Sequence, residues 1–247
     1  MIKAILFDMD DTLLDINLEA YLVSYVAHMS RLMAEISSKP TYSFAYPHIK
    51  SYLAMANPGR LDNYTNDQIY VRTFKTVTGI PLDDPVIHQC IQAYQQEVFP
   101  TMNNPLIHAR ANPGAHEALE AAKRLGMKTV LATNPTFSRT TVGSRMLWGQ
   151  FSWGDFDYVT TRENSHRVKP CLRYYQETAE AIGLDLEECL MVGNDPKRDI
   201  ATDVQRLKTI YIGHGHPRRA FRVTKMDRLA EELETIIDQA NKTTLYV

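Results

Sequence analysis

Short apolar runs alternate with amphipathic segments through the second half of the chain. Four of these runs have the continuous apolar character of strands that are buried on both faces. They are residues 128–133, 156–161, 189–193 and 208–213. Helical spacing of apolar positions separates them and continues into a last expected helix at about 227–240. A fifth apolar run, residues 2–7, begins the chain. This alternation predicts an α/β fold with a parallel sheet covered by helices on both faces.

Residues 16–110 have a different pattern. Apolar positions keep helical spacing across 22–36, and further helices are expected from Asn66 and from Asp84-Pro85. Clusters of proline and glycine interrupt the segment, and none of it resembles a strand. The pattern therefore predicts an all-helical module inserted after the first strand. The expected division is a core of residues 1–15 and 111–247 with a helical cap of residues 16–110.

Composition narrows the class of protein. The 247 residues are 44% hydrophobic and 23% charged, as in ordinary globular proteins, and the formal net charge of −2 gives no reason to expect nucleic acid as a partner. No apolar run approaches the ~20 residues of a membrane helix. Only Met1 precedes the first strand, and the three cysteines lack metal-like spacing. We therefore expect a cytoplasmic protein without a membrane partner, whose oligomeric state the sequence leaves open.

Polar residues occur where the predicted strands end. Strand 2–7 runs directly into aspartates, and the later strands are followed by a hydroxyl, amides, a lysine and further acids. These residues are Asp8, Asp10, Thr133, Asn134, Lys169, Asn194, Asp195 and Asp199. In open parallel sheets, ligands bind at the carboxyl ends of the strands, so we expect these side chains to share one cleft. Carboxylates, a hydroxyl and a lysine suit a phosphoryl group and a divalent cation.

The same residues resemble the four motifs of the haloacid dehalogenase-like superfamily, in the order that the superfamily has them. Asp8-Met9-Asp10-Asp11-Thr12 is similar to the first motif, and Thr133 at the end of its strand to the second. Lys169 before Pro170 corresponds to the third, and residues 192–199 to the fourth. The resemblance implies a Rossmann-like core, and residues 16–110 look like a helical cap of the C1 type.

The resemblance also implies a mechanism. Asp8 would be the nucleophile that forms an aspartyl phosphate, and Asp10 the general acid and base. Thr133 would hydrogen-bond the transferring phosphoryl group, and Lys169 would neutralise its charge. Thr12 and Asn134 are assigned to substrate binding. The reaction implied is hydrolysis of a small phosphate monoester.

The resemblance implies Mg²⁺ as the cofactor. The oxygen-bearing side chains of the motifs suit this ion, because it prefers oxygen ligands. Its expected ligands are the Asp8 carboxylate, the Asp10 backbone carbonyl and a residue of the fourth motif. The superfamily usually has aspartate directly after the glycine, where this chain has Asn194. Asn194 and Asp195 both remain candidates, and the charge of Asp195 favours it slightly. Asp199 is expected to orient metal-bound water or Lys169.

Three other functions fit the sequence less well. A phosphomutase of the same superfamily is less favoured, because mutases usually carry Gly-Val or Gly-Ile where this chain has Asp11-Thr12. A non-enzymatic aspartyl phospho-acceptor would carry its aspartate on a middle strand, whereas Asp8 follows the first. A calcium loop starting at Asp8 is excluded, because Leu13 stands where such a loop needs glycine. Substrate specificity is expected from cap residues, with Arg60, Arg72 and Lys75 as candidates.

Overall fold

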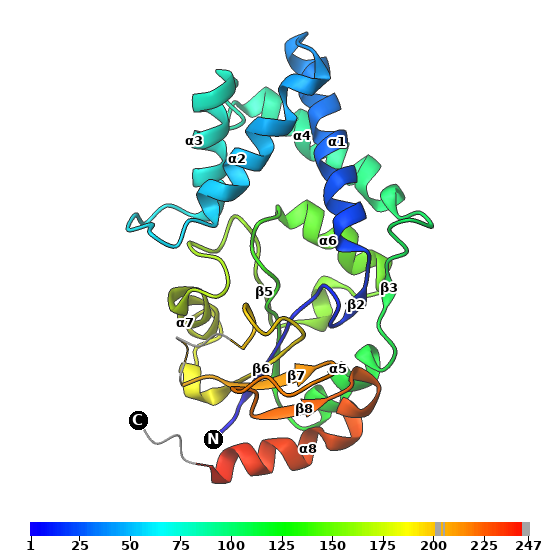
Figure 1. The fold of residues 1–247 in the computed structure, drawn as a ribbon, viewed down its shortest axis with the longest axis vertical. Helices are drawn as coiled ribbons and strands as arrows, with labels where there is room; N and C mark the ends of the chain where they lie inside the picture. The colour runs from blue at the N-terminus through cyan, green and yellow to red at the C-terminus, as the bar shows by residue number, and fades with distance from the viewer. Residues whose placement is uncertain (201–203, 205, 244–247) are drawn as a thin grey trace.

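A computed structural model describes residues 1–200, 204 and 206–243. Six parallel strands form one sheet in the order β5-β4-β1-β6-β7-β8 (Figure 1). The strands are β1 (Ala4–Phe7), β4 (Lys128–Leu131), β5 (Tyr158–Val159), β6 (Cys189–Gly193), β7 (Lys208–Ile212) and β8 (Arg222–Thr224). The predicted α/β fold with a parallel, Rossmann-like sheet is confirmed.

The register of the sheet brings the ends of three strands to one level. Phe7, the last residue of β1, pairs with Leu131 of β4 on one side and with Val192 of β6 on the other. The chain segments that follow these strands therefore begin side by side at the carboxyl edge of the sheet. Asp8 and Asp10 emerge from the middle of this edge, between the segments that carry Thr133 and Asn194.

Alternate residues of β1 pack into two apolar clusters, one on each face of the sheet. Ile5 and Phe7 belong to the larger cluster, whereas Ala4 and Leu6 belong to the smaller. Helices α5 (Ala115–Arg124), α6 (Arg139–Trp148) and α8 (Met226–Lys242) contribute buried residues to the larger cluster, and α7 (Leu172–Glu180) to the smaller. Two short 3-10 helices, η3 (Trp153–Asp155) and η4 (Leu186–Glu188), complete this part of the chain.

The inserted segment is helical, as predicted. It consists of α1 (Leu18–Ser37), η1 (Thr41–Ser43), α2 (Ala45–Met55), α3 (Asn66–Thr78), α4 (Pro85–Val98) and η2 (Phe99–Met102). Figure 1 shows these helices gathered beyond one edge of the sheet. The chain leaves for the segment through β2 (Leu14–Asp15) and returns through β3 (Arg110–Ala111), which pair antiparallel. This two-stranded ribbon lies next to the boundaries expected at 15/16 and 110/111, and the division into core and cap stays a prediction.

Several local predictions were wrong. Helices α2 and α6 were not predicted, because Pro47 weakens the helical signal of the first and the β-branched residues and glycine at 140–143 weaken that of the second. Strand β8 was also not predicted. Thr65, not Asn66, is the N-cap of α3, and Asn66 is its fully buried first residue. Helix α5 begins after Gly114, its N-cap residue, which has a left-handed backbone conformation. Strand 208–213 ends at Ile212, which lies within the usual uncertainty of boundaries.

No helix in the described part of the chain combines the length and the apolar character needed to cross a membrane.

Candidate active site

Asp8 and Lys169 lie at the centre of a small acidic pocket at the carboxyl edge of the sheet. The pocket has a volume of about 90 Å³. Its lining comes from the segments after β1 and β6, from the loops before α6 and α7, and from the first turn of α1. The lining residues are Asp8, Asp10, Asp11, Leu18, Asn134, Lys169, Asn194, Asp195, Arg198 and Asp199. Most of the predicted site residues are therefore brought together.

Lys169 joins two buried carboxylates. Its Nζ donates to Asp8 Oδ1 at 2.7 Å and to Asp199 Oδ1 at 2.6 Å. The Lys169 side chain is only 1% exposed. Burial alone would lower the pKa of Lys169, but the charges of Asp199 and Asp8 outweigh burial and hold this pKa well above its ordinary value. Lys169 is therefore a cation at neutral pH, and it lies beside Asp8, the predicted nucleophile.

Burial and neighbouring carboxylates raise the pKa of Asp8 by more than Lys169 lowers it. Burial and the nearby Asp199 carboxylate raise the pKa of Asp8 to about 7, although Lys169 opposes both effects. The Asp10 carboxylate adds to the rise. A buried aspartate that is this difficult to ionise indicates a site short of positive charge. A bound divalent cation would supply the missing charge.

The fourth-motif residues have separate roles. Asn194 Oδ1 accepts a hydrogen bond from Thr12 Oγ1 at 3.1 Å, and the same Thr12 Oγ1 lies 3.5 Å from Asp8 Oδ2. The side-chain oxygens of Asp8 and Asn194 therefore flank one hydroxyl. Asp195 Oδ1 instead accepts from the backbone N–H groups of Lys197 and Arg198, at 2.8 and 3.2 Å. Of the two candidate ligands, Asn194 lies toward the Asp8 oxygen that Lys169 leaves free.

Asp199 links Lys169 to the backbone of the fourth motif. Its Oδ2 accepts the Asp195 backbone N–H at 3.0 Å while its Oδ1 accepts from Lys169. Gly193 makes this arrangement possible, because a Cβ at position 193 would overlap the Asp199 carboxylate. These contacts place Asp199 beside Lys169, and its role in orienting the lysine stays a prediction.

The second-motif residues follow the end of β4. Asn134 lines the pocket, and its Oδ1 accepts the Lys169 backbone N–H at 3.2 Å. Thr133 is buried, and its backbone carbonyl accepts from the hydroxyls of Thr160 and Tyr174 at 2.7 and 3.0 Å. Thr133 does not belong to the pocket lining given by the described residues. Its predicted contact with a phosphoryl group therefore stays a prediction.

The donor set fits a hard cation. Among residues 1–200, 204 and 206–243, no three His, Cys, Asp or Glu side chains converge as a metal cluster. The candidate ligands are instead one carboxylate, Asp8, together with an amide oxygen or second acid from the fourth motif and the Asp10 backbone carbonyl. All of these are oxygen atoms, which Mg²⁺ prefers over nitrogen or sulfur. The deficit of positive charge around Asp8 points the same way.

Sequence reasoning missed the partner of Asp10. The Nη1 of Arg145, on α6, donates to both carboxylate oxygens of Asp10 at 2.7 Å. Arg145 is completely buried, whereas the Asp10 side chain keeps 17% of its surface exposed. One signal was available: Arg145 shares the helical face of the buried Val142 and Met146, where a charge requires a partner.

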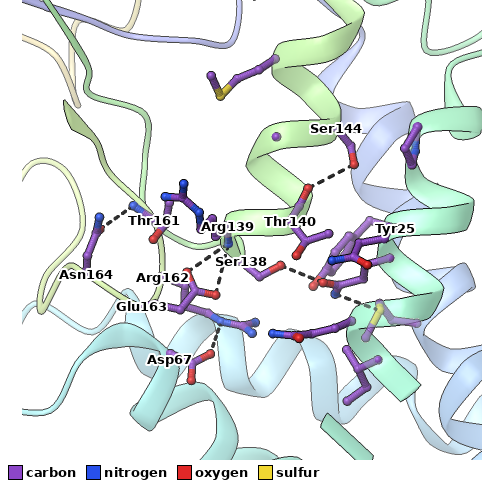
Figure 2. Close-up of a pocket in the computed structure, with 18 of the residues that line it drawn as sticks. Tyr25, Asp67, Ser138, Arg139, Thr140, Ser144, Thr161, Arg162, Glu163 and Asn164 are labelled. Carbon is purple, nitrogen blue, oxygen red and sulfur yellow. Dashed lines mark hydrogen bonds and ion pairs between the residues drawn. The ribbon is translucent and has the colours of Figure 1, made fainter. Parts of the chain in front are cut away.

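A second, larger cavity lies between α6 and the helical segment. Its volume is about 860 Å³, and Tyr25 of α1 is part of its wall. Figure 2 shows Ser138 and Thr140 of the α6 region facing this cavity, with Arg162 and Glu163 beside them. Two of its acidic groups already have partners: Arg162 Nε donates to Asp67 at 2.8 Å, and the Arg139 backbone N–H donates to Glu163 at 3.0 Å. None of the residues that line it lines the acidic pocket.

The loop before α3 is bound to the core by buried hydrogen bonds. Asn66 Nδ2 donates to the carbonyls of Pro135 and Arg167, both at 3.1 Å, and its backbone N–H donates to Ser165 at 2.8 Å. Arg60 Nη1 donates to Asn66 Oδ1 at 2.8 Å. The helical segment therefore touches the loops that carry both Asn134 and Lys169.

The expected specificity residues do not line the acidic pocket. Arg60 is buried and donates to Met55, Asp62, Tyr64 and Asn66 within its own segment. Arg72 stacks on Tyr64, with its Cζ 4.1 Å from the ring centroid. Arg72 and Lys75 border a separate hollow on α3. Leu18 is the residue of the helical segment that reaches the pocket.

Comparison with known proteins agrees with this geometry. The proposed phosphatase YhcW of Bacillus subtilis (strain 168) is 25% identical over 215 residues, which are 86% of this chain and 84% of YhcW. A haloacid dehalogenase-like phosphatase from Thermococcus onnurineus has a similar fold, with a TM-score of 0.54, 19% identity, and coverage of 96% and 98% of the two chains. β-Phosphoglucomutase from Clostridium difficile has a TM-score of 0.56 at 15% identity, with 98% of each chain covered.

The family model for haloacid dehalogenase-like hydrolases matches residues 2–202, which include every predicted site residue. The strand ends, the lysine between two carboxylates and the aspartate pair after β1 occur within this match. The chain therefore belongs to the haloacid dehalogenase-like hydrolase family and is a hydrolase.

Proposed function

We propose that this hydrolase is a Mg²⁺-dependent phosphatase of small phosphate monoesters that works through an aspartyl phosphate on Asp8. The observation that carries the proposal is the unequal environment of the two Asp8 oxygens. Oδ1 is held by Lys169 at 2.7 Å, whereas Oδ2 lies 3.5 Å from the Thr12 hydroxyl, which also donates to Asn194. One oxygen is thus fixed and neutralised, and the other keeps only a long contact with a hydroxyl.

The proposed reaction has two steps. In the first, an Asp8 oxygen bonds to phosphorus as the ester P–O bond breaks, and Asp10 gives its proton to the leaving oxygen. In the second, water bonds to phosphorus and transfers a proton to Asp10, and the Asp8–phosphorus bond breaks to release phosphate. Lys169 offsets the charge of Asp8 and of the phosphoryl group throughout. Phosphoryl transfer depends mainly on such positioning and electrostatics.

Mg²⁺, when bound, would neutralise phosphoryl oxygens and supply the positive charge that the pocket lacks. The residues proposed to hold it are Asp8, Asp10 through its backbone carbonyl, and Asn194. The shared contact of Asp8 and Asn194 with Thr12 supports Asn194 over Asp195, whose carboxylate accepts backbone N–H groups instead. We further propose that residues 16–110 act as a cap that closes the substrate side of the pocket through Leu18.

A screen of phosphorylated metabolites with Mg²⁺ tests this function. We expect release of inorganic phosphate from small monoesters, loss of activity in excess EDTA, and recovery when Mg²⁺ is restored. Asp8→Asn is the control for contaminating phosphatases. Transfer of phosphate to a second sugar phosphate without net release would indicate a mutase instead. Phosphate release that is undiminished in EDTA or in Asp8→Asn would contradict the proposal.

A further inference from the structure

Arg145 makes an ion pair whose surroundings are unusual for a structural arginine. Its side chain is completely buried, and Nη1 alone contacts both Asp10 oxygens at 2.7 Å. Nε and Nη2 are buried and have no hydrogen-bond partner among the described residues. Among the described residues, the guanidinium therefore hydrogen-bonds to Asp10 alone. A buried cation is costly unless it is paired, so Asp10 explains why an arginine is tolerated here.

Aromatic rings fix the position of this guanidinium. The Arg145 Cζ lies 4.6 Å from the centroid of the Phe137 ring and 5.4 Å from that of Tyr21. Such contacts attract a cation and restrict its movement. Tyr21 belongs to α1, and Phe137 follows the second motif, with 5.6 Å between their ring centroids. The helical segment and the core thus hold Arg145 together.

We propose that Arg145 is a positioning residue that orients the Asp10 carboxylate for proton transfer. This inference rests on the proposed function, in which Asp10 is the general acid and base. Arg145 does not line the acidic pocket or the larger cavity, so it acts through Asp10 and not on a substrate. Because Nη1 contacts both oxygens, either oxygen can turn to a leaving group while the other keeps the carboxylate anchored.

The test compares two esters that differ in their need for protonation. Phenyl phosphate has a poor leaving group, whereas p-nitrophenyl phosphate has one that leaves without much help from an acid. A misplaced general acid should slow the first ester more than the second. We expect Arg145→Met to lower kcat/KM for phenyl phosphate on the order of 10- to 100-fold, and that for p-nitrophenyl phosphate clearly less. Arg145→Lys, which keeps the charge, should recover part of the loss.

A double-mutant cycle separates positioning from a purely structural role. If Arg145 acts through Asp10, the Arg145→Met/Asp10→Asn double variant should be about as slow on phenyl phosphate as Asp10→Asn alone. Arg139→Met is the matched control: Arg139 lies on the same helix and stacks on Trp153 with its Cζ 3.7 Å from the ring centroid. None of the hydrogen bonds or ring contacts of Arg139 involves Asp10, so its removal should not produce dependence on the leaving group.

Equal losses on the two esters, or single-variant losses that multiply in the double variant, would overturn the role of Arg145. If Arg145→Met does not fold, Arg145→Lys decides by the same comparison: a selective loss supports the proposal and a uniform effect overturns it. Failure of the proposed function has a different signature. Phenyl phosphate turnover by Asp10→Asn at the wild-type rate would remove Asp10 as the general acid, whatever Arg145 does.

Discussion

At the scale of single residues, one lysine is shared by two buried carboxylates of the site. Lys169 is the group through which Asp8 and Asp199 are held together, with N–O distances of 2.7 and 2.6 Å. The pKa of Asp8, raised to about 7 by burial and by Asp199, shows that the balance is already strained with Lys169 in place. The chemistry of the site and its stability are therefore linked at this residue.

Replacing Lys169 with methionine should damage both properties. Two buried carboxylates would lose their shared cation, and breaking a buried ion pair typically costs about 3–5 kcal/mol. We expect a decrease of this size in the free energy of unfolding at neutral pH, measured by urea denaturation. Turnover of p-nitrophenyl phosphate should fall below the limit of detection. A Lys169→Met enzyme within tenfold of wild type would show that the lysine is dispensable.

His48 gives a residue-scale prediction away from the site. It is 3% exposed, and its ring Nδ1 contacts the Tyr70 hydroxyl at 2.5 Å. Burial lowers the pKa of His48 from 6.5 to about 4. Below pH 6.5 the unfolded chain binds a proton that the folded chain refuses, so the contribution of His48 to folding stability falls as the pH decreases through this window. The loss attributable to His48 should reach about 3 kcal/mol near pH 4.

The pH series needs a variant in which the imidazole is absent. Urea unfolding of wild type and His48→Gln at several values between pH 4 and 7 provides it, because glutamine can keep a hydrogen bond to Tyr70 without titrating. The difference in stability between the two proteins should shift in favour of the variant as the pH decreases. A difference that stays constant across the window would mean that His48 titrates normally.

The predictability of the site follows the same residue scale. Asp8, Asp10 and Asp199 could be predicted because they follow strands whose ends the topology aligns, and Lys169 because it matches the third motif of the superfamily. Arg145 and Asn66 could not, because their functions depend on partners 135 and up to 101 residues away in the chain. The expected contributions of Arg60 and Arg72 failed for a related reason. Their guanidinium groups interact within the helical segment, which charge patterning alone does not reveal.

At the scale of elements, α3 is bound to the core at its first turn. Asn66 is completely buried and donates to the carbonyls of Pro135 and Arg167, which lie in the loops that carry Asn134 and Lys169. Arg167 Nη2 in turn donates to the Arg60 and Asp62 carbonyls at 2.8 and 2.7 Å. The start of this helix therefore supports two loops of the active site.

Asn66→Ala should weaken both the fold and the site. It leaves two carbonyls and the Arg60 guanidinium with fewer partners, for an expected cost of about 2–4 kcal/mol. Thr65→Ala is the matched control, because it removes only the exposed capping bond to Gln68 and should cost about 1 kcal/mol. Urea denaturation measures both. We also expect Asn66→Ala, unlike Thr65→Ala, to raise KM for p-nitrophenyl phosphate; equal effects of the two variants would exclude a specific supporting role.

Element prediction from the sequence succeeded where apolar periodicity is strong. The central strands β1, β4 and β6 and helices α1, α4 and α8 lie where the pattern placed them. Helix α6 was not predicted because threonine, valine and glycine at 140–143 are poor helix formers. The helix forms because tertiary packing of Val142 and Met146 overrides that preference. Strand β8 was missed because three residues give too short a pattern.

At the scale of the whole molecule, the helical segment and the core share one apolar interior. Tyr21 and Tyr25 of α1 lie against Phe137 of the core, with ring centroids 5.6 and 5.1 Å apart. The same aromatic cluster holds Arg145 on Asp10. The arrangement connects the helical segment to Asp10, the proposed general acid. Local sequence patterns do not reveal this connection, because it is formed by residues from three separate stretches of chain.

The central claim is that Asp8 becomes phosphorylated, and intact-mass spectrometry after rapid quench tests it most directly. Asp10→Asn should be mixed with p-nitrophenyl phosphate and Mg²⁺, because this variant keeps the nucleophile but lacks the base that promotes hydrolysis of the acyl phosphate. We predict one added phosphoryl group, placed on Asp8 by peptide mapping, and none in Asp8→Asn. A phosphoryl group on any other residue, or continued turnover by Asp8→Asn, would contradict the account.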